Sequence, residues 1–86
     1  MPTYKIIFEK AAQKFLDKQD KNKRLRLYRA IYKLPGGTDI KKLKGHNLYR
    51  LRVGDCRILY TVEDAIRLID IEHIDNRGDV YKRLKE

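Results

Sequence analysis

The sequence predicts an α+β domain, in which a twisted, antiparallel-rich four-stranded sheet carries an N-terminal helical hairpin on one face, in the order β-α-α-β-β-β. Three observations support this prediction. Two runs of alternating residues flank a Gly-Asp pair at positions 54–55, which is typical of a β-hairpin. Apolar residues recur at helical spacing between positions 11 and 34. Shorter alternating runs lie toward both ends of the chain, so residues 1–86 are expected to form a single domain.

The first 34 residues change from a strand pattern to a helix pattern. Residues 3–8 alternate and predict a first strand. From residue 9 to residue 19 the apolar period becomes helical, which predicts a short first helix. A second helix is expected to begin at Asp20 or Asn22, because either side chain can cap a helix N-terminus. It is expected to end just before Pro35, since proline disfavours helical geometry at the residue before it.

Residues 49–60 are predicted to form the central hairpin, with a two-residue turn in which glycine supplies a positive φ. In that register Arg52 lies opposite Arg57. Side chains alternate between the two faces of a strand, so Arg50 joins these two arginines on one face while the apolar side chains occupy the other. One face is therefore core, and the other carries three clustered positive charges.

This arginine cluster has two interpretations, which the spacing leaves open. Like charges opposite each other across a sheet are destabilising, so the cluster favours a bound anion. Alternatively, the arginines cover a solvated face and pair with nearby carboxylates such as Asp70 and Glu72.

The remaining segments complete the predicted sheet. Residues 39–45 are basic and are expected to lead into the hairpin as a short strand or loop. Residues 65–74 predict the last strand, in which Ile69 and Ile71 match the core side of the hairpin. His73 shares their parity and is predicted to be a buried or half-buried core residue.

The chain is strongly basic. It has 21 Lys and Arg residues against 12 Asp and Glu, for a net charge of +9, which favours a nucleic-acid partner or an acidic protein partner. No helix pairs a basic face with Trp or Phe, and no apolar run has the length of a signal peptide or a membrane span. We therefore expect no membrane association and a cytoplasmic location.

Common catalytic and metal-binding signatures do not occur in the sequence. The single cysteine, Cys56, is expected to pack as a small apolar residue, and no Cys or His spacing suggests a metal. There is no Ser-His-Asp or Cys-His signature, and Gly36-Gly37 lacks the strand and lysine of a phosphate-binding loop. We expect neither a metal nor a small-molecule cofactor.

What remains is a set of basic and aromatic side chains suited to phosphate chemistry. The candidates are Arg50, Arg52 and Arg57 on the hairpin, Lys42, Lys44 and His46 before it, and Arg77 and Tyr81 near the C-terminal end. Arginine clamps phosphates with two donors, and tyrosine can donate a proton or stack on a base. RNA fits such a set because its own 2′-hydroxyl can attack the adjacent phosphate, so the protein need only align and stabilise the reacting groups. The set suits simple binding equally well.

Three segments resemble successive motifs of the RelE-type toxins of bacterial and archaeal toxin–antitoxin pairs. They are Lys-Leu-Lys-Gly at 42–45, Tyr-Arg-Leu-Arg-Val-Gly-Asp-Cys-Arg-Ile-Leu-Tyr at 49–60 and Asp-Asn-Arg-Gly-Asp-Val-Tyr at 75–81. The resemblance covers nearly the whole chain and indicates the RelE/ParE superfamily. It implies a ribosome-dependent mRNA interferase that cleaves messenger RNA in the ribosomal A site. Its implied partners are the ribosome, its mRNA and a RelB-like antitoxin that wraps round the toxin.

Two other functions stay open beside this one. ParE-type members of the superfamily act on DNA gyrase, so a gyrase inhibitor of the same fold is the first alternative. A basic RNA-binding or partner-binding module without catalysis is the second.

The resemblance also implies roles for individual residues. Arg50 and Arg52 match basic residues that orient or deprotonate the attacking 2′-hydroxyl, and Arg57 matches an arginine that steadies the phosphate. Tyr81 matches a tyrosine that stacks on the base or acts as general acid. Lys44 matches a basic residue that binds RNA.

Two positions depart from the family pattern. Well-studied members have lysine where this chain has Arg50 and Arg52, and arginine holds its proton too tightly to be a good general base. Either positioning and electrostatics suffice, or His46 or another group supplies the base.

Arg77, in contrast, matches the family pattern, because it resembles the basic residue of the last strand region.

Overall fold

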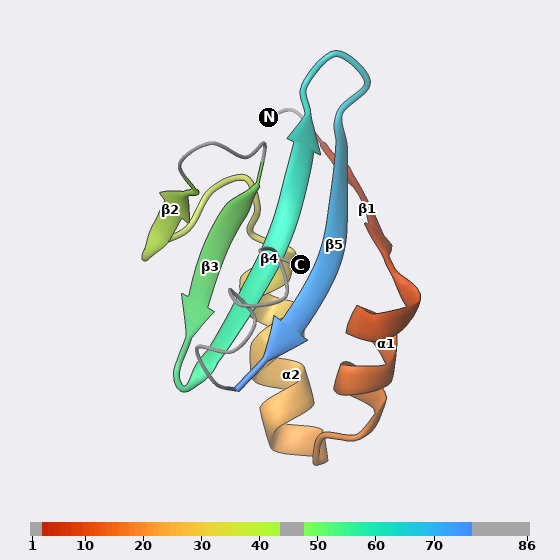
Figure 1. Cartoon of the computed structure of the whole chain (residues 1–86), viewed down its shortest axis with the longest axis vertical. Coiled ribbons are helices and arrows are strands. Elements are labelled where there is room, and N and C mark those ends of the chain that lie inside the picture. Colours follow the sequence, from red (N-terminus) through yellow and green to blue (C-terminus); the bar gives the residue numbers. More distant parts are fainter. Residues whose placement is uncertain (1–2, 44–47, 77–86) are drawn as a thin grey trace.

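The computed structural model describes residues 3–43 and 48–76. These residues form five strands and two helices (Figure 1). In chain order the elements are β1 (Lys5–Phe8), α1 (Lys10–Asp17), α2 (Lys21–Ile31), β2 (Ile40–Lys42), β3 (Tyr49–Val53), β4 (Cys56–Glu63) and β5 (Leu68–Asp75).

The five strands form one sheet in the order β1-β5-β4-β3-β2. β1 runs parallel to β5, and the other neighbouring pairs are antiparallel. The predicted α+β class, with an antiparallel-rich sheet and an N-terminal helical hairpin, is confirmed, but the described sheet has five strands rather than four. The additional strand is β2, which pairs with β3 and sets Ile40 opposite Leu51. Three residues are too short for an alternating pattern, so β2 becomes recognisable only through its partner.

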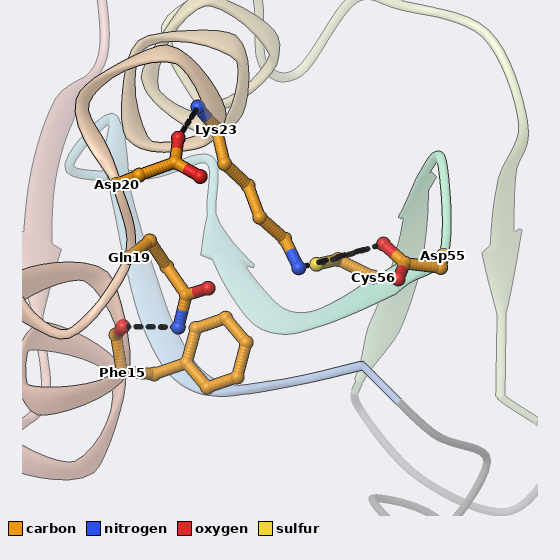
Figure 2. Close-up of polar contacts among 6 residues, drawn as sticks. All are labelled: Phe15, Gln19, Asp20, Lys23, Asp55 and Cys56. Atoms are coloured by element: carbon orange, nitrogen blue, oxygen red, sulfur yellow. Dashed lines mark hydrogen bonds and ion pairs between the residues drawn. The ribbon is translucent and has the colours of Figure 1, made fainter.

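Both helices begin close to the predicted positions. α2 is capped by Asp20, whose side chain accepts a hydrogen bond from the backbone N–H of Lys23 at 2.8 Å (Figure 2). The helix ends at Ile31, three residues earlier than Leu34. Leu34 N–H donates to the carbonyl of Ile31 at 3.0 Å, so the chain tightens into a turn before Pro35.

The helices bury one face of the sheet. α1 contacts β5 and α2 contacts β3, and Figure 1 shows α2 passing behind the central strands. The fully buried residues of this core include Ala12, Leu16, Leu27 and Ile31 from the helices and Ile58, Tyr60, Ile69 and Ile71 from the sheet. No helix in residues 3–43 and 48–76 has the length and apolar character needed to cross a membrane.

The central hairpin has the predicted register. Gly54 has a φ of 59°, as the two-residue turn requires. Arg52 lies opposite Arg57, and Arg50 lies opposite Leu59. Ile58 and its core neighbours face the helices, so the arginines point to the other side of the sheet.

A contact from α2 reaches the turn of this hairpin. Figure 2 shows Lys23 extending from α2 toward the turn, where its Nζ lies 3.7 Å from Oδ1 of Asp55. Next to it, Cys56 is buried as predicted, and burial raises the pKa of its thiol. The turn is therefore held from the helix side, which leaves its arginine side uncovered by α1 and α2.

A β-bulge in β5 changes the face on which His73 lies. Leu59 pairs with His73, whereas the next residue of β4, Tyr60, pairs with Ile71, so position 72 is an extra residue. Beyond the bulge, Ile74 rather than His73 belongs to the core. His73 is half-buried, as predicted, but its predicted place on the core side is wrong, because one inserted residue reverses the faces of all that follow.

Candidate functional site

The candidate site is the arginine face, the side of the sheet opposite the helices that carries Arg50, Arg52 and Arg57. The three arginines come from the paired strands β3 and β4. Their predicted clustering is confirmed by the register, since Arg52 and Arg57 are direct partners. Two like charges in that position repel each other and need a counter-charge.

Two carboxylates lie at the ends of the row that contains these partners. Arg52 N–H donates to the carbonyl of Asp39 at 3.1 Å, so Asp39 continues the β2–β3 register one residue before β2. On the other side, Arg57 lies opposite Asp75 of β5. The row across the sheet is therefore acid, arginine, arginine, acid.

A second row runs parallel to the first and contains the third arginine. It consists of Lys41, Arg50, Leu59 and His73 from four neighbouring strands. Leu59 is fully buried although it lies on the face opposite the helical core. Lys41 and His73 are additions that sequence reasoning missed, because their faces depend on the pairing of β2 and on the bulge in β5.

Asp39 is the counter-ion of the arginine face. Nη2 of Arg50 donates to its Oδ1 at 3.2 Å, and Nε of Arg52 lies 3.9 Å from its Oδ2. In the part of the chain that the structure describes, the ion pairs of Arg50 and Arg52 are made with Asp39, and none of the three arginines pairs with Asp70 or Glu72. The suggested pairing with those two carboxylates is therefore wrong.

Lys42 does not lie with the arginines. It pairs with Tyr49, which in turn pairs with the core residue Tyr60. The two tyrosine rings stack with centroids 5.5 Å apart, and Nζ of Lys42 lies 6.0 Å from the Tyr49 ring centroid. The structure thus places Lys42 on the helix side of the sheet, at its edge, while Lys41 takes the position on the arginine face.

Four other predicted site residues, Lys44, His46, Arg77 and Tyr81, lie outside the described residues.

Asp70 pairs with Thr61, two residues after Leu59, and so lies on the same side of the sheet as the arginines, but it and Glu72 line a separate part of that surface. Together with Glu9, Lys10, Ala11 and His73 they line a pocket that includes none of the three arginines. Oδ1 of Asp70 is buried and has no hydrogen-bond partner among residues 3–43 and 48–76. Burial, and then the neighbouring carboxylates of Glu9 and Glu72, raise the pKa of Asp70 from 3.8 to about 6.

This raised pKa has a consequence for stability. From pH 3.8 to about pH 6, folded Asp70 keeps a proton that the unfolded chain has released, so its contribution to stability falls as the pH rises. We expect Asp70→Asn to raise the free energy of unfolding by about 1 kcal/mol at pH 7, a value reduced for solvent screening of a partly exposed group. Below about pH 4 the variant and the wild type should converge.

Urea unfolding between pH 3.5 and 7.5 checks this expectation. Asp17→Asn, on the exposed face of α1, is the control for loss of one negative charge. An unfolding difference that is the same at every pH, or that grows toward acid, would contradict the raised pKa.

No group of three or more His, Cys, Asp and Glu side chains among the described residues is arranged to hold a metal ion.

Known proteins share this fold and much of this sequence pattern. Residues 6–81 match the family described as the ParE toxin of the type II toxin–antitoxin system, parDE. A chain of the archaeal RelE–RelB complex from Pyrococcus horikoshii is 30% identical, with a TM-score of 0.73 over 90% of this chain and 98% of that one. A chain of the RelB–RelE complex from Methanococcus jannaschii is 31% identical, with a TM-score of 0.71 over 90% and 96%.

The isolated E. coli RelE toxin has the same fold. Its TM-score is 0.73 at 21% identity, over 96% of each chain. No curated protein matches the chain. Since the family match spans most of the sequence and reaches from β1 past β5, the protein belongs to the ParE toxin family and is a type II toxin–antitoxin toxin of the RelE/ParE superfamily.

Proposed function

We propose that this toxin is a metal-independent endoribonuclease that cleaves mRNA in the ribosomal A site. The observation that carries the proposal is the arginine face, where Arg50, Arg52 and Arg57 meet on the side of the sheet away from the helices. The similarity at 30% and 31% identity to chains of RelE–RelB complexes supports it.

The proposed reaction uses the RNA's own nucleophile. The 2′-hydroxyl gives up its proton to a base, for which His46 is the candidate, as its oxygen bonds to the adjacent phosphorus and forms a 2′,3′-cyclic phosphate. The bond to the leaving 5′-oxygen breaks, and that oxygen takes up a proton. Arg52 and Arg57, opposite each other across the hairpin, stabilise the additional negative charge of the transition state. Arg50 and Arg52 act by position and charge, because arginine is a poor proton acceptor. Tyr81 is proposed to protonate the leaving oxygen, and Arg77 to assist at the phosphate.

Other residues are proposed to hold the RNA strand. Lys44 and His46 keep this role from the sequence, and Lys41 joins them through its place beside Arg50. Lys42 is positioned to contact RNA only at the sheet edge, since it lies on the other face. The net charge of +9 draws the protein toward polyanions such as the ribosome and its message.

The proposed protein partner is a RelB-like antitoxin. RelE and RelB occur together in the complexes from Pyrococcus horikoshii and Methanococcus jannaschii. A toxin that cuts ribosome-bound messages acts in the cytoplasm, which is the location we propose.

The family description favours one second candidate. Because the matching family is that of ParE toxins, inhibition of DNA gyrase without RNA cleavage is the alternative function. The two candidates differ in what is damaged inside the cell, so one experiment separates them.

We expect induction of the toxin without an antitoxin to stop growth, with messages cut inside their reading frames and translation arrested. Mapping RNA 5′-ends and measuring DNA breaks after induction checks this result. Growth arrest with DNA breaks and intact messages would establish the gyrase alternative instead. Uninterrupted growth with a folded protein would favour the non-catalytic binding module.

A further inference from the structure

Asp39 lies at a place on the arginine face where a single anion reaches two guanidinium groups. Its Oδ1 accepts from Arg50 at 3.2 Å, and its Oδ2 lies 3.9 Å from Nε of Arg52. One negative group with two oxygens between two arginines is also how a phosphate is held. The carboxylate therefore occupies a position whose surrounding donors fit a phosphate.

The backbone conformation of Asp39 positions its carboxylate beside the arginines. Asp39 has a φ of 59°, a left-handed conformation that aspartate tolerates better than most residues. The hydrogen bond from Arg52 N–H to the Asp39 carbonyl, at 3.1 Å, holds that conformation next to the β2–β3 ladder. The ion pair is thus a built feature of the sheet edge and does not depend on a freely moving loop side chain.

The ion pair between Asp39 and Arg52 is nevertheless weak. The Asp39 side chain is 47% exposed and that of Arg52 is 52% exposed, and their contact of 3.9 Å is longer than a hydrogen bond. Exposed ion pairs of this kind contribute little to stability. The Arg52 contact therefore adds little to the hold on the carboxylate, and a competing anion has to replace mainly the hydrogen bond from Arg50 at 3.2 Å.

The arginines also keep unused donors. A guanidinium group has five N–H donors. The Arg50 side chain is only 15% exposed. Its Nε is buried and has no hydrogen-bond partner in the described part of the chain. A tetrahedral phosphate has more acceptor positions than a carboxylate, so it can satisfy donors that Asp39 leaves unpaired.

We propose that Asp39 is an internal competitor for the phosphate site, and that an RNA phosphate displaces its carboxylate from Arg50 and Arg52 when the substrate binds. The proposal rests on the proposed function in one respect, since it names RNA as the source of the phosphate. The displacement involves no covalent step. It makes Asp39 a restraint on phosphate binding, and it predicts that removal of its charge tightens binding.

The test measures phosphate binding without the ribosome. Pyrophosphate is titrated into the full chain labelled with ¹⁵N, and the arginine Nε resonances are followed by NMR. We expect Asp39→Asn to lower the Kd for pyrophosphate by roughly fivefold, the factor that corresponds to losing a weak exposed ion pair. Arg50 and Arg52 should show the largest shifts. Asp39→Gly is the second variant, because glycine also accepts the positive φ.

Two matched controls define the result. Asp17→Asn on α1 removes one negative charge away from the arginines and should leave the Kd within twofold of the wild type. A short single-stranded RNA in which every 2′-hydroxyl is methylated, and which therefore cannot be cleaved, should show the same order of affinities as pyrophosphate.

Several results would overturn the proposal. If Asp39 positions the arginines instead of competing with phosphate, both Asp39 variants will bind pyrophosphate more weakly. Equal tightening in Asp17→Asn would reduce the effect to net charge, and tightening for pyrophosphate but not for RNA would remove RNA as the displacing ligand. Failure of ribosome-dependent cleavage would refute the proposed function but would leave the pyrophosphate measurement unchanged, so the two outcomes are distinguishable.

Discussion

Tyr81→Phe is expected to slow cleavage of ribosome-bound message by about 10²- to 10⁴-fold, with little change in affinity for the ribosome. The phenylalanine keeps the aromatic ring but has no hydroxyl, so it cannot protonate the leaving 5′-oxygen. Single-turnover cleavage, with the toxin in saturating excess over the ribosome–message complex, measures the chemical step directly. Tyr32→Phe is the matched control, because Tyr32 is an exposed tyrosine beyond the end of α2.

A second substitution separates the possible roles of Tyr81. If the ring serves only as a stacking platform, Tyr81→Phe will be nearly neutral and Tyr81→Ala will weaken RNA engagement by about 1 to 3 kcal/mol. If Tyr81 is a packing residue, Tyr81→Ala will lower the melting temperature. Full cleavage by a well-folded Tyr81→Ala protein would exclude Tyr81 from the site.

Arg57→Ala is expected to weaken transition-state stabilisation by about 2 to 4 kcal/mol, or roughly 30- to 1,000-fold in rate. The physical reason is the loss of a donor to the phosphate as its negative charge increases. The free energy of unfolding should change by less than about 0.5 kcal/mol. Arg57 lies between Arg52 and Asp75, so its removal relieves one repulsion and loses one favourable charge neighbour.

Cleavage kinetics and urea unfolding of the same preparation test both parts of this expectation. Arg29→Ala, on the exposed side of α2, is the control for the loss of one positive charge. A variant of Arg57 that cleaves normally but is strongly destabilised would show that Arg57 is structural. A loss of cleavage that Arg29→Ala reproduces would show that only the total charge matters.

The central hairpin shows how much of the candidate site could be predicted from the sequence. A two-residue turn with glycine at position 54 permits one register, and that register places Arg52 opposite Arg57. Alternation then assigns Arg50 to the same face. These relations are local in the chain, since they depend on neighbouring residues and on the geometry of one turn.

The partners of the arginines could not be predicted in the same way. Asp39 is eleven residues before Arg50 in the chain, and it reaches that residue because β2 pairs with β3. His73 faces the arginine side because β5 has one extra residue at the bulge. Neither feature has a signal in the alternation of its own segment, because each is set by the strand that lies beside it.

The sequence by itself determined the α+β class, the core side of the hairpin and the clustering of three arginines on the opposite side. Only the tertiary structure decided that Asp39 pairs with two of these arginines and that Lys41, not Lys42, accompanies them. The physical reason is that strand pairing is a long-range interaction with a two-residue period. A shift of one residue in pairing changes the face of every side chain that follows, without any change in local sequence.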